Sequence, residues 1–252
     1  MAIARIGVSL PALYAFVDYD NIEKDLRVGG PVNLAKALAP CIPASVLVAH
    51  GEVVFRLYGG WRSGGVLTHE AQTLLPLITH GSPLYISVTD SGNAVNIRVS
   101  VELADKPFGA TVPLQDTFIR DRDLRKFRSR SRPWAGCLNS GVCGFAHFEN
   151  WTQSTLCPTA NCKAELGDVL VRDEQKMVDT LVVADIAYLV LNQSASDVVV
   201  VSSDADIWPA VLLATRSGCN VLHIHSKSGR KTPRHLLVAL DNLDHFYQQT
   251  SV

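Results

Sequence analysis

The sequence lacks a marked excess of charge, because 23 Lys and Arg stand against 24 Asp and Glu for a net charge of -1. A balance of this kind gives no overall indication of nucleic-acid binding. The chain also lacks any run of the roughly 18 apolar residues that a membrane helix needs, so we expect no membrane partner. Its apolar start has no small-residue cleavage site, which favours a first strand over a signal peptide. We therefore expect a cytoplasmic location.

The chain has neither an internal repeat nor a low-complexity linker, and 47% of its 252 residues are hydrophobic, enough for a sizeable core. Apolar runs typical of strands occur at 13–18, 52–59, 83–90, 93–103, 197–204 and 220–225. Helical patterns lie between or after them at 31–42, 68–81, 172–193, 206–218 and 233–246. This alternation predicts an α/β fold, a Rossmann-like, three-layer and mostly parallel sheet with helices on both faces.

The α/β pattern breaks in the middle of the chain, where a basic stretch is followed by one rich in Cys, Gly and Asn. We therefore predict one α/β domain formed by 1–116 and 164–252, with 117–163 as an insertion. The insertion holds the cysteines Cys137, Cys143, Cys157 and Cys162. In a reducing compartment, structural zinc in a Cys₄ site is a better prediction than disulfides, with His147 able to replace one thiolate. Free thiols are the alternative.

The basic stretch "RDRDLRKFRSRSR" (120–132) has a local charge of about +5 although the whole chain is neutral. Arg guanidinium groups pair with phosphates, and aromatic rings such as those of Phe127 and Trp134 stack on unpaired bases. We predict RNA contact here, against the alternative of a solvated charged loop. The candidate residues are Arg125, Lys126, Arg128, Arg130 and Arg132.

Carboxylates follow two of the predicted buried strands. Asp18 ends the first strand, and Asp204 and Asp206 stand at the end of the strand at 197–204. The carboxyl ends of parallel strands meet at the edge where active sites form, so these acids should converge. The intervening helix is expected to carry Lys176 and Asp179 three residues apart on one face.

Four ionised carboxylates in one place repel one another, by roughly 3 kcal/mol for each pair at about 5 Å and an effective dielectric of 20. A hard divalent cation, Mg²⁺ or Mn²⁺, would neutralise them and activate water against a phosphodiester. The alternative is structural: the acids could cap helices, and Asn21 could form an Asx-turn. Asp185 lies roughly 240° around the helix from Asp179 and is a secondary candidate.

Three stretches together resemble the NYN group of PIN-like ribonucleases. They are "FVDYDNI", "KMVDTLVVADI" and "VVVVSSDADIWPAVLLATRSGCNV", and "RLYGGW" (56–61) is similar to that family's second strand and aromatic loop. The resemblance covers about 13–80 and 170–225. The long insertion departs from the family pattern, as does Ser203, where glycine is usual.

The resemblance implies a metal-dependent endoribonuclease that acts on RNA. Asn21 would orient the site or a phosphate, and the matching motif positions are Lys176 and Ser202, with Asp20 and Asp185 at positions that are often acidic. The implied ligands of Mg²⁺ or Mn²⁺ are Asp18, Asp179, Asp204 and Asp206. Two alternatives remain open: a phosphohydrolase of the haloacid-dehalogenase type, with Asp18 and Asp20 as nucleophile and acid, and an inactive RNA-binding module. The oligomeric state is also open, a homo-oligomer included.

Overall fold

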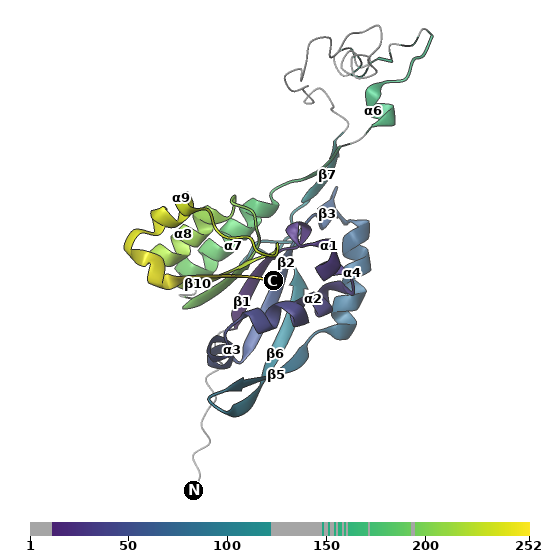
Figure 1. The fold of residues 1–252 in the computed structure, drawn as a ribbon. Helices are drawn as coiled ribbons and strands as arrows, with labels where there is room; N and C mark the ends of the chain where they lie inside the picture. Colours follow the sequence, from purple (N-terminus) through teal and green to yellow (C-terminus); the bar gives the residue numbers. More distant parts are fainter. Residues whose placement is uncertain are drawn as a thin grey trace. The chain divides into compact units, whose positions relative to one another are not determined.

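The computed structural model describes residues 12–121, 148, 151, 154, 156–157, 159, 161–170, 172–192 and 195–252. The chain divides into two units (Figure 1). The first, here called the sheet unit, comprises Met1–Thr117 and Lys176–Val252. The second, here called the inserted unit, comprises Phe118–Gln175.

The sheet unit contains a seven-stranded sheet in the order β11-β10-β9-β1-β2-β6-β5. Every neighbouring pair is parallel except β5 and β6, which are antiparallel. The strands are β1 (Leu13–Asp18), β2 (Glu52–Tyr58), β5 (Leu84–Asp90), β6 (Asn93–Leu103), β9 (Asp197–Val201), β10 (Asn220–His225) and β11 (Tyr247–Ser251). The predicted α/β architecture with a mostly parallel sheet is therefore confirmed.

Two hydrophobic clusters lie on the two faces of this sheet, because consecutive strand residues point to opposite sides. In β1, Ala15 and Val17 belong to one cluster and Phe16 to the other, which explains why this strand is apolar throughout. The first cluster includes α2 (Gly30–Leu38), α3 (Ala44–His50) and α4 (His69–Gly81). The second includes α7 (Val178–Asn192) and α8 (Trp208–Arg216). Figure 1 shows these two helix groups on opposite sides of the strands.

Short elements complete the sheet unit: η1 (Tyr19–Asn21), α1 (Lys24–Arg27), η2 (Ala39–Cys41), the hairpin β3 (Arg62–Ser63) with β4 (Val66–Leu67), α9 (Arg234–Leu237) and η4 (Val238–Phe246). Helix α4 begins as its sequence predicts, since the Thr68 side chain accepts a hydrogen bond from Ala71 N at 3.4 Å. Helix α2 likewise has its proline in the first turn.

Helix α7 is shorter than the predicted helix at 172–193. Residues Arg172–Gln175 form strand β8, which pairs antiparallel with β7 (Phe118–Asp121). The helix begins only at Val178, after Met177 adopts a left-handed φ of 61°. Because β8 is paired inside the inserted unit, this unit extends to Gln175 rather than to 163.

The end of the chain also differs from the predicted single helix at 233–246. Asp241 has φ 53° and ψ -120°, which interrupts the helical backbone, and β11 then pairs parallel with β10. The sequence of β11, "YQQTS", carries little of the apolar pattern that indicates a strand. Helix α3 was not among the predicted elements either.

The inserted unit contains the β7–β8 pair, the single turn α6 (Leu166–Val169) and a bridge between Leu156 and Glu165. In the sheet unit, Lys176 N donates to Thr117 O at 3.0 Å, so the residues on either side of the insertion are adjacent. The insertion therefore leaves and re-enters the sheet unit at one point.

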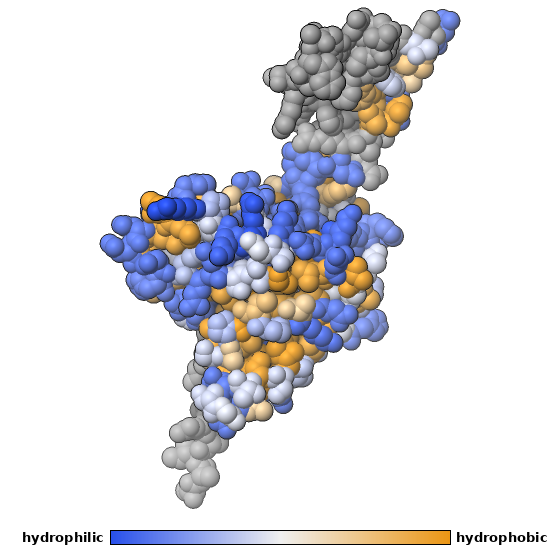
Figure 2. Space-filling model, viewed as in Figure 1, coloured by the Kyte–Doolittle hydropathy of each residue, from blue (hydrophilic) through white to orange (hydrophobic). Residues whose placement is uncertain are grey.

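Hydrophobic residues reach the surface around the middle of the sheet unit on the face shown in Figure 2. Within the described residues, no single helix has the length and apolar composition to cross a membrane. The one pair of helices there that meets both criteria together, 30–41 with 44–50, is bent by 114° at its break.

Candidate functional site

The strand order reverses beside β1. Strand β2, which follows β1 in the chain, lies on one side of it, and β9, more than 170 residues later, lies on the other. In open α/β sheets, ligands bind outside the carboxyl ends of the strands at such a reversal. Asp18 ends β1, and Ser202 directly follows β9. Both residues lie at this position.

Asp18 is buried and hydrogen-bonded to one residue close to it in the sequence and to another far along the chain. Its Oδ2 accepts one bond from Ser202 Oγ at 2.7 Å and another from Asn21 Nδ2 at 2.7 Å. Ser202 Oγ in turn accepts a bond from Asp204 N at 2.9 Å. Since Val17 pairs with Val201, the next residues on the two strands are neighbours, which places Asp18 against Ser202.

Helix capping does not account for these acids. Asp18 precedes η1 without a side-chain capping bond. The N-cap of α8 is Ile207, also without a side-chain bond. Asp204 instead closes a turn, because its Oδ1 accepts a bond from Asp206 N at 3.0 Å. The backbone thus curves around Asp204 before the helix begins.

Negative charge accumulates around Asp18. Burial raises the pKa of Asp18, the hydrogen bonds from Asn21 and Ser202 oppose this, and the charge of Asp204 adds to it. The pKa of Asp179 is raised first by burial and then by the charges of Asp18, Asp204 and Asp206. The structure therefore brings the four acids close enough to influence one another. We call Asp18, Asp179, Asp204 and Asp206 the acidic cluster.

Asp20 lies beside the acidic cluster in different surroundings. Its Oδ2 accepts a bond from Gly60 N at 3.1 Å, and its Oδ1 lies 3.9 Å from Arg27 Nη1. Burial, followed by the charge of Glu70, raises the pKa of Asp20 to about 6. A Cβ on Gly59 would lie 2.8 Å from Asp20 Oδ2 and closer still to a Trp ring, so only glycine fits there.

Arg27 and Glu70 were not among the candidate residues. Arg27 Nη1 lies 4.0 Å from Glu70 Oε1, and its guanidinium carbon stands 5.3 Å from the centre of the Tyr19 ring. Neither residue belongs to a short motif. Glu70 lies on α4, which the sequence predicts as a helix without indicating a role for this side chain. No sequence signal connects them with Asp20.

The sequence predicted that Lys176 and Asp179 share one helix face, and this prediction is wrong. Lys176 lies before Val178, the first residue of α7. The left-handed Met177 separates the two residues and sets the direction from which the helix starts. A non-glycine residue in this conformation is uncommon and is often found near functional sites.

Asp185 is fully buried in a separate polar network, on the same face of the sheet as α7. Its Oδ2 accepts bonds from Arg56 Nε at 3.0 Å and Tyr58 OH at 2.8 Å, and its Oδ1 accepts one from Phe108 N at 2.7 Å. These contacts make it a structural residue. Arg56 was an available signal, since an arginine inside an apolar strand requires a buried acid as partner.

The oxygen-only donors of the acidic cluster have the chemistry that Mg²⁺ and Mn²⁺ prefer. In the described part of the chain, no three His, Cys, Asp or Glu side chains are arranged as a ready-made metal site. The residues present fit a hard cation by their chemistry and their mutual repulsion. Their arrangement in this structure is not that of a closed metal cage.

The zinc and RNA candidates lie largely outside the described residues, namely Cys137, Cys143, His147, Arg125, Lys126, Arg128, Arg130 and Arg132. Cys157 and Cys162 are described and are free thiols. A narrow turn brings them near each other, with Cys157 N donating to Ala164 O and Cys162 N to Thr159 O. The pKa of the Cys157 thiol is lowered by hydrogen bonds, first with Thr159 and also with Cys162.

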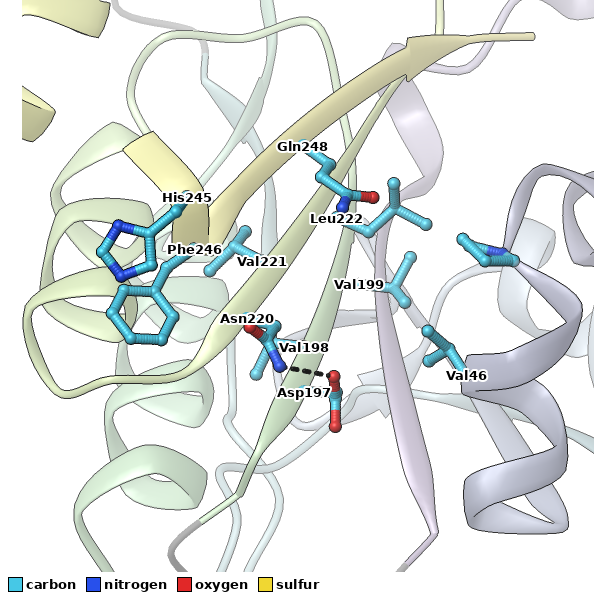
Figure 3. Close-up of a pocket in the computed structure, with 11 residues that line it drawn as sticks. Val46, Asp197, Val198, Val199, Asn220, Val221, Leu222, His245, Phe246 and Gln248 are labelled. Atoms are coloured by element: carbon cyan, nitrogen blue, oxygen red, sulfur yellow. Dashed lines mark hydrogen bonds between the residues drawn. The ribbon is translucent and has the colours of Figure 1, made fainter. Parts of the chain in front are cut away.

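A pocket of about 210 Å³ lies at the opposite, amino ends of β9 and β10 (Figure 3). Its walls are mainly apolar, and Asp197 is held there by Asn220 Nδ2 at 3.0 Å and by His50 Nε2 at 3.1 Å. The carboxylate of this pocket is thus already engaged by the protein. We therefore do not place the functional site there.

Fold and site together define an α/β protein with an acidic cluster at the reversal of its strand order. A protein of Sinorhizobium fredii named "Uncharacterized protein y4oD" is 32% identical over 83 residues, or 32% of this chain and 39% of that protein. The chain thus matches well under two thirds of this relative's length. No protein-family model matches the chain. No solved structure matches it either.

Proposed function

We propose that this protein is a divalent-cation-dependent ribonuclease of the PIN-like, NYN type. The observation that carries the proposal is the link between Asp18, Ser202 and Asp204 at the reversal of the strand order, with Asp179 close by. The same residues carry the resemblance to the NYN group. Two independent arguments, one from motif order and one from position in the sheet, thus support the same site.

The acidic cluster would hold the cation. Asp18, fixed by Asn21 and Ser202, would be its most rigid ligand, and Asp179 and Asp204 would rearrange towards it. A Mg²⁺ or Mn²⁺ ion bound there would neutralise the carboxylates and supply a reactive water for phosphodiester hydrolysis. The protein's own contribution is to hold the acids near one another and to orient the RNA backbone beside them.

The inserted unit would serve substrate binding. We propose that its four cysteines, of which Cys157 and Cys162 are adjacent in a turn, bind a structural zinc ion. The basic residues 125–132 would contact the phosphates of RNA. Zinc content and RNA affinity of the purified protein test these two roles separately from cleavage.

The decisive experiment is a cleavage assay with single-stranded and structured RNA, in Mn²⁺ or Mg²⁺ and in EDTA. Wild-type protein should cut only with the cation. Asp204→Asn should lose at least about 100-fold in rate, as is typical when a group that stabilises transition-state charge is removed. Asparagine keeps an acceptor oxygen for Asp206 N, so this variant should fold.

The matched control is Asp244→Asn, an exposed acid in η4 outside the acidic cluster. This variant should cut at the wild-type rate. Equal cleavage by wild type and Asp204→Asn would indicate a contaminating nuclease and contradict the proposal. Absence of cleavage by either protein, with RNA binding retained, would favour the RNA-binding module.

One observation favours the haloacid-dehalogenase alternative: the pKa of Asp20 near 6 suits a general acid two residues after a nucleophile. Against it, Asp20 Oδ2 is held by Gly60 N. Trapping of an aspartyl-phosphate at Asp18 would support the alternative. Products with a cleaved internal phosphodiester would support the ribonuclease.

A further inference from the structure

Ser202, which donates to Asp18, lies one residue beyond the end of β9 and is held there by β10. Ser202 N donates to Ile224 O at 3.1 Å, as a residue within the strand would. Its carbonyl oxygen lies 2.9 Å from His223 Nε2, so a side chain of β10 takes the place of a further strand partner. Because both backbone groups of Ser202 are bound to β10, the direction of its side chain towards Asp18 is fixed.

The atoms around His223 determine where its hydrogen lies. A carbonyl oxygen only accepts, so Nε2 carries the hydrogen that it shares with Ser202 O. Burial lowers the pKa of His223 to about 4, so the ring is neutral near pH 7 and its Nδ1 is an acceptor. Tyr247 OH, 2.8 Å away, therefore donates to Nδ1. Since Tyr247 uses its only hydrogen there, Thr232 Oγ1 donates to the Tyr247 oxygen at 2.5 Å.

These hydrogen bonds form one chain that ends at the acidic cluster. The first three bonds lead from Thr232 through Tyr247 and His223 to the Ser202 carbonyl, and each can polarise and strengthen the next. Ser202 then connects them, through its own backbone and side chain, to the bond on Asp18. All five residues are buried, with Tyr247 the most accessible at 9% exposed. The chain is therefore shielded from water along its whole length.

Asn21, the second donor to Asp18, is held from the end of β10 as well. Ser226 directly follows β10 and is fully buried, and its Oγ lies 3.0 Å from Asn21 O. The Ser226 hydroxyl must give its hydrogen to this carbonyl. Its oxygen then accepts from Ser203 Oγ, 3.2 Å away. Ser203, where the family pattern has glycine, thus supports the same turn.

Both residues that donate to Asp18 Oδ2 thus depend on side chains of β10 or of the residue after it. We propose that His223 and Ser226 are positioning residues, which hold Ser202 and Asn21 so that Asp18 keeps one orientation for a divalent cation. Neither residue would touch the cation or the RNA. The inference rests on the proposed function and adds the residues that keep its cation site in shape.

The test measures Mn²⁺ binding to the full-length protein by isothermal titration calorimetry, in addition to cleavage. Asp204→Asn shows which part of the binding belongs to the acidic cluster. His223→Leu removes the donor to Ser202 and should weaken that binding by about 10–100-fold, as is typical when a residue that orients a metal ligand is lost. The kcat for RNA cleavage should fall, while affinity for RNA in EDTA stays at the wild-type value.

Two further variants act on the same network. His223→Gln is the conservative change, because its amide can still donate to Ser202 O, and it should recover most of the Mn²⁺ affinity. Ser226→Ala removes the donor to Asn21 O and should weaken Mn²⁺ binding several-fold.

A pair of tyrosine variants separates positioning from stability alone, and keeps the inference testable if His223→Leu does not fold. Tyr247→Phe removes the donor to His223 but keeps the ring against Trp208, with ring centres 5.6 Å apart in the wild type. Its matched control is Tyr58→Phe, which removes a buried hydroxyl bonded to Asp185 at 2.8 Å in the other network. Both should lower stability in urea, but only Tyr247→Phe should weaken Mn²⁺ binding.

Three results would overturn the inference: wild-type Mn²⁺ affinity in both His223→Leu and Ser226→Ala, equal losses of affinity in the two tyrosine variants, or no binding of Mn²⁺ at the acidic cluster of wild type. Weakened Mn²⁺ binding in variants of a protein that never cuts RNA would sustain the inference and reject the nuclease. Cation-dependent cleavage that is unchanged in every β10 variant would do the reverse.

Discussion

Asp18 shows how a single carboxylate can be prepared for a ligand by its neighbours. Both side-chain hydrogen bonds that it receives fall on the same oxygen, Oδ2, and they come from residues that are three and 184 positions away. Such bonds fix the orientation of the side chain while burial raises its pKa. The result is a rigid acid in a region of accumulated negative charge.

Asp20 provides a prediction at this scale, because its raised pKa makes stability depend on pH. Its pKa is about 6 in the folded protein and about 3.9 in an unfolded chain, so between these values the folded state binds more protons. Stability should therefore fall as the pH rises from about 4 to 6. Asp20→Asn should remove this loss and gain up to about 3 kcal/mol over wild type at pH 7.

Urea denaturation at a series of pH values checks this prediction. Asp25→Asn, a change at an exposed acid of α1, is the control and should follow the wild-type curve. If the free energy of unfolding changes with pH in the same way for Asp20→Asn and wild type, folding does not raise the pKa of Asp20 and the prediction is wrong.

Most secondary-structure elements were predictable because their signals are local. The Thr68 cap, the first-turn proline of α2 and the apolar strand β1 all act within a few residues. Strand β11 was not predictable, since its pairing with β10 decides its conformation against a polar sequence. The same holds for β8, whose partner β7 lies more than 50 residues away.

The residues of the candidate site likewise divide into those that local sequence predicts and those that depend on distant contacts. Motif spacing at strand ends indicated Asp18 and Asp204, because strand ends are local features and parallel strands bring them to one edge. The environment of Asp20 depends on Arg27, Gly60 and Glu70, which meet only in three dimensions. The role of Asp185 likewise depends on Arg56, 129 residues away.

The contact between α7 and β2 provides a prediction at the scale of elements. Arg56 is buried and bonded to Asp185, Tyr58 and Glu102. Removing one member of a buried ion pair leaves an uncompensated charge, so Asp185→Ala should lower the free energy of unfolding by about 3–5 kcal/mol. Replacing both partners, as Arg56→Met with Asp185→Leu, should recover part of this loss.

Urea unfolding of the three proteins measures these effects. The control is the partly exposed pair of Arg98 Nε and Glu52 Oε1, 3.4 Å apart, where Arg98→Ala should cost no more than about 1 kcal/mol. A loss at Asp185→Ala as small as that of the control would mean that the buried network does not hold α7 to the sheet.

At the scale of the molecule, the inserted unit should be removable. Thr117 O and Lys176 N are 3.0 Å apart, so a linker of two to four Gly and Ser residues can replace Phe118–Gln175 without displacing the sheet unit. We expect the shortened protein to unfold cooperatively in urea, with circular dichroism as the measurement. It should bind RNA more weakly and with a lower salt dependence, because the basic residues are gone.

Aggregation or loss of cooperative unfolding in the shortened protein would show that the sheet unit needs the insertion to fold. An unchanged affinity for RNA would exclude the basic residues from binding. The acidic cluster, our proposed cleavage site, lies in the sheet unit, so any residual cation-dependent cutting should still respond to Asp204→Asn.

The strand order has a consequence for synthesis on the ribosome. β1 is central in the finished sheet, yet its neighbour β9 is translated about 180 residues after it. Until then, the half-sheet β5-β6-β2-β1 presents β1 as an open, apolar edge, the kind that pairs with other chains. A nascent chain stalled within the insertion would therefore be a target for chaperones, and completion of β9 would end that dependence.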